Sequence, residues 1–263
     1  ELHVDSGTFY VDTINNFVGI NTTSPFANLS VSGTAYITGT TTITGMVDVS
    51  GRINGAPQLI GQKSAGGSFL LTGVLDTQVV GDYLYAISTD NSGSLEIMNV
   101  ASTTNIRHVS SISHGGNVNM NGPVSMHIVG NYAYILSFTT PALEIIDISV
   151  PQSPKHIGAI ASGNGGTSFA SPGKVHISGN YAFIADLDGL EILDVSDPSN
   201  PRHTSFLSLT GNIIKRIAVS GNYVYLASQL PGLQGSIIAI DIINPITPRI
   251  ESTYSFAGNV YPW

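Results

Sequence analysis

The stretch "GNYAYILSFTTPALEIIDISVPQSP", from Gly130 to Pro154, contains the features that decide the fold. Its opening Gly-Asn can adopt positive φ and form a tight turn. The residues that follow are aromatic and β-branched, as in a buried strand. Another strand follows Pro141, and it ends before Pro151 because proline has no N–H to donate to a sheet. The stretch therefore predicts two adjacent antiparallel strands between turns.

This pattern occurs four times, with turn glycines spaced by 49, 49 and 42 residues. Each copy leaves room for four short strands, which is typical of a propeller blade. We expect the repeated tyrosines to pack between blades and the repeated aspartates to cap turn amides. The repeated residues are Gly81, Tyr83, Gly130, Tyr132, Gly179, Tyr181, Gly221, Tyr223, Asp147, Asp194 and Asp241.

The predicted fold class is all-β, with a segment of different character at residues 1–56 and a β-propeller of four-stranded blades at residues 57–263. Four complete copies are visible. Residues 57–67 match the fourth-strand region of a copy, and residues 254–263 match the start of another. The pattern predicts that the natural protein continues beyond Trp263 with a further blade. A smaller propeller closed by a partner chain is the alternative.

Two stretches carry a family resemblance. "GNYAYILS…ALEIIDISVPQSP" and "GNYAFIADLDGLEILDVSDPSNP" resemble the LVIVD repeat of bacterial and archaeal surface-associated β-propellers. The resemblance extends over residues 57–263 and implies a propeller, but it implies no reaction. The first copy departs from the pattern, since residues 99–105 lack both prolines and the aspartate, and the fourth copy has Ala239 in place of isoleucine.

Within residues 1–56, the stretch from Thr34 to Gly55 predicts a run of short alternating strands that Gly interrupts every six or so residues. Such strands cannot bury a core alone, so they need neighbouring chains or a continuous solenoid. The phrase "VGINTTSP…LSVSG" resembles a repeat of trimeric phage tail fibres and bacterial surface fibres, which implies self-association into a trimer or filament. A small β-cap packed on the propeller is the alternative. Asn21 and Asn28 begin glycosylation sequons, which matter only in a host that glycosylates.

Composition excludes several classes of function. Only 10% of residues are charged, the net charge is −8, and the nine basic residues are scattered, so a nucleic-acid surface is not expected. No apolar run approaches the roughly 20 residues of a membrane helix. The chain has no cysteine and therefore no disulfide or thiolate chemistry.

Two histidines are the candidates for a metal site. His127 and His176 stand three residues before the turn glycine in adjacent copies, where the other copies have Gln78 and Ala218. First strands line a propeller axis, so the two imidazoles could bind a metal or an anion. A histidine satisfied by backbone partners is the commoner case. No nucleophile elbow, phosphate loop or calcium loop is present, so the sequence indicates no catalytic residue and no cofactor.

The sequence thus favours a non-enzymatic, exported structural or adhesive protein, located outside the cell or on a virion. Its β-stalk would present a propeller whose Gly-rich loops, residues 115–122 and 163–173, bind a protein or a glycan. Three alternatives stay open: a phage tail fibre or receptor-binding protein, a subunit of a surface filament or lattice, and a metal- or sugar-binding propeller enzyme.

Overall fold

The computed structural model describes residues 9–12, 17–20, 29–31, 71, 73–89, 92–102, 105–229 and 235–256, and the chain divides into the compact units 1–58 and 59–263. The first unit holds β1 (Phe9–Asp12), β2 (Phe17–Ile20) and β3 (Leu29–Val31). β2 pairs antiparallel with β1 and parallel with β3. Asn21, Asn28 and the matches at residues 57–67 and 257–263 lie outside the described residues.

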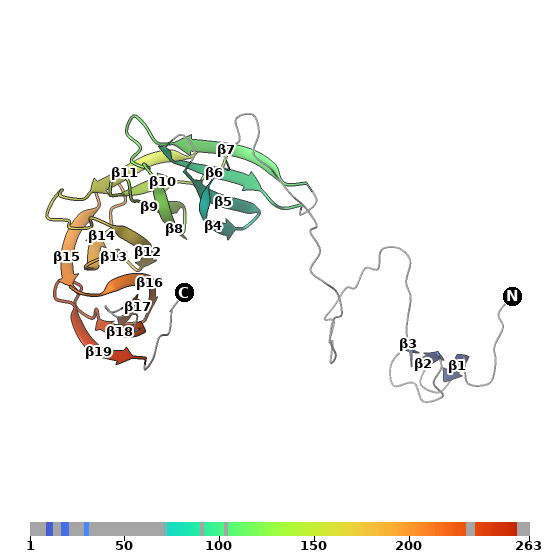
Figure 1. The fold of residues 1–263 in the computed structure, drawn as a ribbon. Coiled ribbons are helices and arrows are strands. Elements are labelled where there is room, and N and C mark those ends of the chain that lie inside the picture. Colours follow the sequence, from blue (N-terminus) through green and yellow to red (C-terminus); the bar gives the residue numbers. More distant parts are fainter. Residues whose placement is uncertain are drawn as a thin grey trace. The chain divides into compact units, whose positions relative to one another are not determined.

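The second unit contains four antiparallel sheets of four strands each, and in every sheet the strands pair in chain order (Figure 1). Blade 1 comprises β4 (Val74–Val80), β5 (Tyr83–Ser88), β6 (Ser94–Asn99) and β7 (Arg107–Ser113). Blade 2 comprises β8 (Pro123–Val129), β9 (Tyr132–Ser137), β10 (Ala142–Asp147) and β11 (Lys155–Ala161). Blade 3 comprises β12 (Pro172–Ser178), β13 (Tyr181–Asp186), β14 (Gly189–Asp194) and β15 (Arg202–Ser208). Blade 4 comprises β16 (Ile213–Ser220), β17 (Tyr223–Gln229), β18 (Gly235–Asp241) and β19 (Arg249–Ser255).

The prediction of an all-β fold with four-stranded blades is confirmed. Every described element is a strand, and the described part of the chain has no helix long and apolar enough to cross a membrane. The glycines of the predicted turns adopt left-handed backbone conformations, with φ of 59° at Gly130 and 56° at Gly179. A side chain there would strain the turn, which explains why the repeat keeps glycine.

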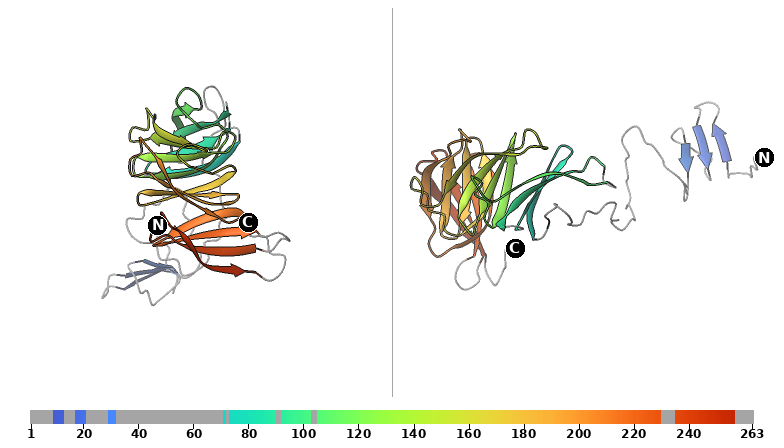
Figure 2. Two further views of the ribbon diagram at one scale, coloured as in Figure 1. Left: turned by 90° about the vertical axis from the view of Figure 1, so that its left-hand side faces the viewer. Right: turned by 90° about the horizontal axis from the view of Figure 1, so that it is seen from above.

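The blades follow one another around an arc. The first strand of each blade contacts the first strand of the next, and these inner strands, β4, β8, β12 and β16, line the inner side of the arc in Figure 1. The fourth strands form its outer side. Adjacent sheets pack face to face (Figure 2). We call the face of a blade toward the preceding blade its leading face and the face toward the following blade its trailing face.

Three buried seams between consecutive blades form the core. In the second strand of blade 2, Ala133 and Ile135 belong to the seam with blade 1, whereas Tyr134 and Leu136 belong to the seam with blade 3. All four side chains are buried. Strand alternation thus gives every interior blade two apolar faces, as expected for a sheet covered on both sides.

The repeated tyrosines contribute to these seams only in part. Tyr83, Tyr132, Tyr181 and Tyr223 are half-buried. The first three lie against the edges of the apolar clusters. The aromatic residue two positions later is more deeply buried in the first three blades, with exposed fractions of 3%, 5% and 1% for Tyr85, Tyr134 and Phe183. The second aromatic position therefore carries more of the packing between blades than the first.

Candidate functional site

Side chains of one inner strand bind the backbone of the next. Asp76 Oδ2 accepts the N–H of Met126 at 3.1 Å, and the residue equivalent to Asp76 in blade 2, Ser125, accepts the N–H of Val175 at 3.3 Å. Inner strands are sheet edges, so these N–H groups have no partner within their own sheet. The blade before supplies the missing acceptor, and in both bonds the acceptor residue precedes the donor residue by 50 positions.

Gln78 and His127 form a second row of the same kind. Gln78 Oε1 accepts the N–H of Ile128 at 2.8 Å, and His127 Nδ1 accepts that of Ile177 at 2.6 Å. The rings of His127 and His176 lie 4.5 Å apart. Burial lowers the pKa of both histidines, and the proximity of His176 lowers that of His127 further. The acceptor role of Nδ1 requires the neutral ring of His127.

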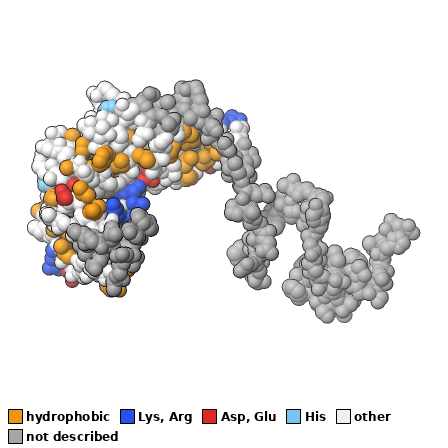
Figure 3. Space-filling model, viewed as in Figure 1, with side chains coloured by type: hydrophobic (Ala, Val, Ile, Leu, Met, Phe, Trp, Pro, Cys, Tyr) orange, Lys and Arg blue, Asp and Glu red, His pale blue; other side chains and the backbone are white. Residues whose placement is uncertain are grey.

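The structure therefore brings the two candidate metal ligands together, with one nitrogen of His127 already engaged by the backbone. Within the described ranges, no group of three His, Asp or Glu residues could hold a metal ion. The inner side also carries cations near β12 and β16 (Figure 3). Lys174 Nζ lies 3.2 Å from Asp76 Oδ2, and Arg216 occupies the equivalent position in blade 4.

A buried Glu–His pair occurs in each of the first three blades. The pairs are Glu96 with His108 at 3.0 Å, Glu144 with His156 at 2.5 Å and Glu191 with His203 at 2.5 Å. All three glutamate side chains are fully buried, whereas the histidines keep 23% to 27% of their side-chain surface exposed. The glutamates recur at one position of the repeat and the histidines at another, twelve residues later, but the pairing of the two became apparent only in the fold.

The pairs of blades 2 and 3 also anchor the loop that enters each blade. Glu144 Oε2 accepts the N–H of Asn119 at 2.8 Å, and Glu191 Oε2 accepts that of Ser168 at 3.1 Å. Burial raises the pKa of Glu144 and Glu191, and the hydrogen bonds from histidine and from the backbone oppose this rise. Each of these two glutamates thus links the third strand of its blade to the fourth strand, through histidine, and to the loop that enters the blade, through a backbone N–H.

Blade 4 replaces this polar pair with an apolar one. Ile238 stands where the other blades have glutamate, and Ile250 stands where they have histidine. Both members change together, because a buried glutamate without its partner would be strongly destabilising. The substitution indicates that the pair stabilises the seam and is not needed as a chemical group in every blade.

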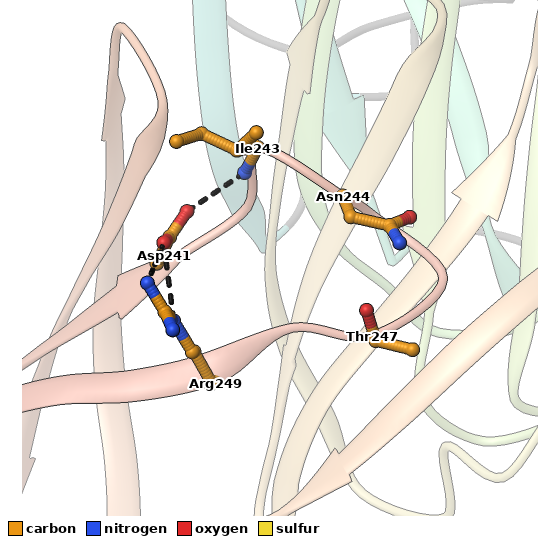
Figure 4. A pocket seen from close by; sticks show the side chains of 5 residues that line it. All are labelled: Asp241, Ile243, Asn244, Thr247 and Arg249. Carbon is orange, nitrogen blue, oxygen red and sulfur yellow. Dashed lines mark hydrogen bonds and ion pairs between the residues drawn. The ribbon is translucent and has the colours of Figure 1, made fainter.

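The repeated aspartates cap the outer turns. Asp147, Asp194 and Asp241 each accept the N–H two residues later, at 2.8 to 2.9 Å. Hydrogen bonds from Ser149, Ser196 and Ile243 lower the pKa of the three carboxyl groups. Asp241 also binds Arg249 at 2.9 Å beside a shallow cavity of about 260 Å³, which Figure 4 shows in close view.

The two Gly-rich loops are anchored at one end and exposed at the other. Val118 and Met120 are buried in the first loop, as are Thr167 and Phe169 in the second, while residues 115–117 and 163–166 are exposed. Both loops lead from the fourth strand of one blade to the inner strand of the next. Their exposed residues are therefore held on rigid supports.

The second loop borders a cavity of about 480 Å³ between blades 2 and 3. Its polar lining comes from Asn164 of the loop and from Asn200, Arg202 and His203 of blade 3. The buried Glu191 contacts His203 Nδ1 and fixes the imidazole ring. Gly166 leaves room for this ring, since a Cβ at position 166 would lie 3.2 Å from its Cδ2 atom. These groups can donate hydrogen bonds to one polar ligand and accept hydrogen bonds from it.

A related cavity of about 540 Å³ is lined by Asn105, Arg107 and His108 of blade 1 and by Gln152 of blade 2. The tetrapeptide Asn-x-Arg-His therefore occurs in both cavities, at residues 105–108 and 200–203. This tetrapeptide was not among the site residues predicted from the sequence. Its repetition was visible, but only the fold shows that it borders a cavity.

Comparison with known proteins identifies part of the chain. The LVIVD repeat model matches residues 124–161, 171–205 and 213–255, which correspond to blades 2, 3 and 4. The resemblance noted in the sequence is thereby confirmed for these blades. No protein of curated function matches the chain.

Solved structures with similar folds are distant in sequence. A protein from Lactobacillus plantarum shares 12% identity over 68% of this chain and 54% of its own, with a TM-score of 0.57. The periplasmic gluconolactonase of Pseudomonas aeruginosa shares 14% identity over 76% of this chain and 61% of its own, also with a TM-score of 0.57. A hypothetical selenium-binding protein from Sulfolobus tokodaii shares 12% identity over 70% and 55%, with a TM-score of 0.51.

These similarities concern the fold alone. The chain spans between 54% and 61% of the length of the three structures. One of them is an enzyme, so this architecture is compatible with catalysis in other proteins.

The role of His127 predicts a pH dependence of stability. The fold lowers the pKa of His127 and His176 from the ordinary histidine value of 6.5. Their contribution to the free energy of unfolding is therefore complete above pH 6.5, and it is lost as the pH falls from 6.5 through their pKa values in the folded state. His127→Gln supplies the acceptor that blade 1 uses at this position. We expect the melting temperature of the parent to fall further than that of the variant below pH 6.5. Parallel curves for the two proteins would contradict this role.

The Glu–His pair predicts a coupling that unfolding experiments can measure. His156→Ile leaves the buried Glu144 without its imidazole partner and should lower the free energy of unfolding by about 3 kcal/mol. Adding Glu144→Ile reproduces the arrangement of blade 4 and should recover part of this loss, with a coupling energy of about 1–3 kcal/mol in denaturant titrations. Additive effects of the two substitutions would show that the pair does not act as a unit.

Proposed function

We propose that this protein, an LVIVD-repeat protein over residues 124–255, is a non-enzymatic binding protein that acts outside the cell. Residues 1–56 assemble several copies, and the propeller presents its loops to a glycan. The observation that carries the proposal is the cavity of about 480 Å³ beside the second Gly-rich loop. Its volume lies within the usual range of ligand sites, about 300–1,000 Å³.

The lining of this cavity suits a hydroxyl-rich ligand. Asn164 offers an amide donor and acceptor. The Asn200 amide oxygen accepts from Arg202 Nε and Nη2, at 3.3 and 2.7 Å, which holds the guanidinium in place and leaves the Asn200 NH2 group and the other guanidinium N–H groups for a ligand. Arg202 would also favour an acidic sugar, because a guanidinium binds carboxylates in a bidentate manner. Such a ligand would find its partners on the rigid blade as well as on the loop.

The repetition of the histidine in this cavity supports binding over catalysis. His203 is held by Glu191 just as His156 is held by Glu144 in the preceding blade. A catalytic group acts at one site that differs from the rest of a repeat protein, whereas a scaffold group recurs. We therefore assign the Glu–His pairs to the scaffold and not to a reaction.

Assembly and location are supported by the sequence of residues 1–56. The resemblance of this segment to fibre repeats favours several copies joined side by side and a position outside the cell. Several propellers on one assembly would also raise a weak glycan affinity through multivalency.

Glycan binding can be tested on an array of neutral and acidic oligosaccharides. We expect Arg202→Ala to weaken binding at least tenfold, because it removes a charge-assisted contact of roughly 1.5–3 kcal/mol. Lys155→Ala is the matched control, since Lys155 occupies the same position in blade 2 but does not line this cavity. Absence of binding on the array, or equal losses in both variants, would contradict a site at this cavity.

Assembly can be tested by light scattering. The mass of the particle formed by the full chain is compared with that formed by a chain lacking residues 1–56. We expect the full chain to form the larger assembly, with more copies per particle, because the segment supplies strand edges for neighbouring chains. An equal number of copies in both particles would show that residues 1–56 do not join chains and would favour the β-cap.

A further inference from the structure

Every described blade has a basic residue at the start of its fourth strand, and of these blades only blade 1 lacks an acidic residue opposite it. The basic residues are Arg107, Lys155, Arg202 and Arg249. The residues that pair with the last three in register are the capping aspartates Asp147, Asp194 and Asp241. In blade 1 the residue opposite Arg107 is Asn99. The cation of blade 1 therefore faces a neutral amide where the other cations face a carboxylate.

Blade 4 shows what the carboxylate does at this position (Figure 4). Asp241 Oδ1 accepts the N–H of Ile243 and so caps the outer turn. Asp241 Oδ2 accepts hydrogen bonds from Arg249 Nε at 3.2 Å and from Arg249 Nη2 at 2.9 Å. One oxygen atom of the aspartate thus binds the turn, and the other neutralises the guanidinium.

Blade 1 keeps the cap but replaces the acceptor for the guanidinium with a donor. Asn99 Oδ1 accepts the N–H of Ala101 at 3.1 Å, so the NH2 group of Asn99 corresponds to Oδ2 of Asp241. An NH2 group cannot accept a hydrogen bond from Arg107. Instead, the Asn105 amide oxygen accepts from Arg107 Nε and Nη2, at 3.2 and 2.9 Å, and holds the guanidinium in place. The Nη1–H groups and one Nη2–H group are left for a ligand.

These donors border the cavity of about 540 Å³ at blade 1, which we call the blade 1 cavity. Asn99 and Arg107 both line it, and none of its described lining residues is Asp or Glu. Among the described residues, no ion pair joins Arg107 to a carboxylate, including that of Asp82, whose carbonyl accepts the N–H of Val100 close by. The cavity therefore combines a positioned positive charge with an amide donor and has no anion of its own.

The rest of the lining suits a sugar better than a peptide. Gln152 Nε2 donates a hydrogen bond to the Tyr83 hydroxyl at 3.2 Å, which leaves Gln152 Oε1 as an acceptor for a hydroxyl group. The apolar side chains of the lining are limited to Ala101 and Val109, so the methylene groups of an acidic peptide side chain would find little apolar surface.

We propose that the blade 1 cavity binds the carboxylate of a uronic-acid residue in a glycan. The carboxylate oxygens accept hydrogen bonds from the free edge of the Arg107 guanidinium and from the Asn99 NH2 group. The ligand thus supplies the negative charge that Asp241 supplies in blade 4. This site rests on the glycan-binding function proposed above and adds to it a second cavity that selects acidic sugars.

Calorimetric titration of the full chain with trigalacturonate, at low ionic strength, can test this site. The parent is compared with Arg202→Ala, which impairs the other proposed glycan site, so the binding that persists in Arg202→Ala reports on the blade 1 cavity. Adding Arg107→Ala should weaken this remaining affinity roughly tenfold or more, because it removes a charge-assisted contact. Arg249→Ala is the matched control, since Asp241 already neutralises Arg249. Equal affinities after Arg107→Ala and Arg249→Ala would overturn the proposal.

The variant Asn99→Asp tests the same site without removing a contact. It restores the carboxylate of the other blades and keeps an acceptor for the N–H of Ala101. We expect a melting temperature at or above that of the parent, and an affinity for trigalacturonate roughly tenfold or more below that of Arg202→Ala when the two changes are combined. Unchanged affinity would show that the missing carboxylate does not make a site.

Two further ligands test the chemical class. The methyl ester of trigalacturonate keeps the hydroxyl groups but has no charge, so we expect it to leave the blade 1 cavity empty. Binding of the ester as tight as that of the acid would contradict recognition of a carboxylate. Equal affinity for triglutamate would overturn the sugar as the ligand and would favour an acidic peptide.

The same titrations separate this site from the function proposed above. Loss of all trigalacturonate binding in Arg202→Ala would overturn the blade 1 cavity and would support the other one. Full binding in Arg202→Ala, with loss after Arg107→Ala, would support the blade 1 cavity and count against the other. If the parent binds no trigalacturonate, the blade 1 cavity is overturned, while the glycan array still tests the proposed function.

Discussion

The inner strand of every blade is a sheet edge that faces the centre of the arc, and the unpaired N–H groups of this edge constrain the rest of the structure. The protein meets the constraint with side chains of the preceding blade, such as Asp76 for Met126 and His127 for Ile177. An acceptor at these positions fixes the spacing of the blades as well as their hydrogen bonding. The apolar seams then form in the register that these bonds set.

The seams use two chemical solutions for one position. Three blades bury a glutamate beside a histidine, whereas blade 4 has the buried Ile238 and the exposed Ile250 at these two positions. A buried polar group costs free energy unless it is hydrogen-bonded, so we expect the Glu–His pair to be favoured over isoleucines where it also positions a loop. In blades 2 and 3 it does so, and the exposed part of each loop beyond the anchor is free to vary. The proposed glycan site lies at one of these anchored loops.

Much of the fold could be predicted from local chemistry, because the Gly-Asn turns and the proline-ended strands are signals within a few residues. The Glu–His pairs could not be predicted in the same way. Glu144 pairs in register with Ala159, and His156 reaches it only because a bulge follows Ile145. The contact thus depends on an irregularity that no periodic pattern reveals. Likewise, His127 and His176 were predicted as neighbours, but the use of Nδ1 by Ile177 follows only from the offset between two sheets.

The uneven covering of the blades also implies an order of local unfolding. In a linear array of repeats, stability is a sum over units and their interfaces, so a unit with one neighbour opens more readily than a unit with two. Within the described residues, blades 1 and 4 each take part in one apolar seam, whereas blades 2 and 3 each take part in two. The two central blades should therefore protect their amides longest from exchange with solvent.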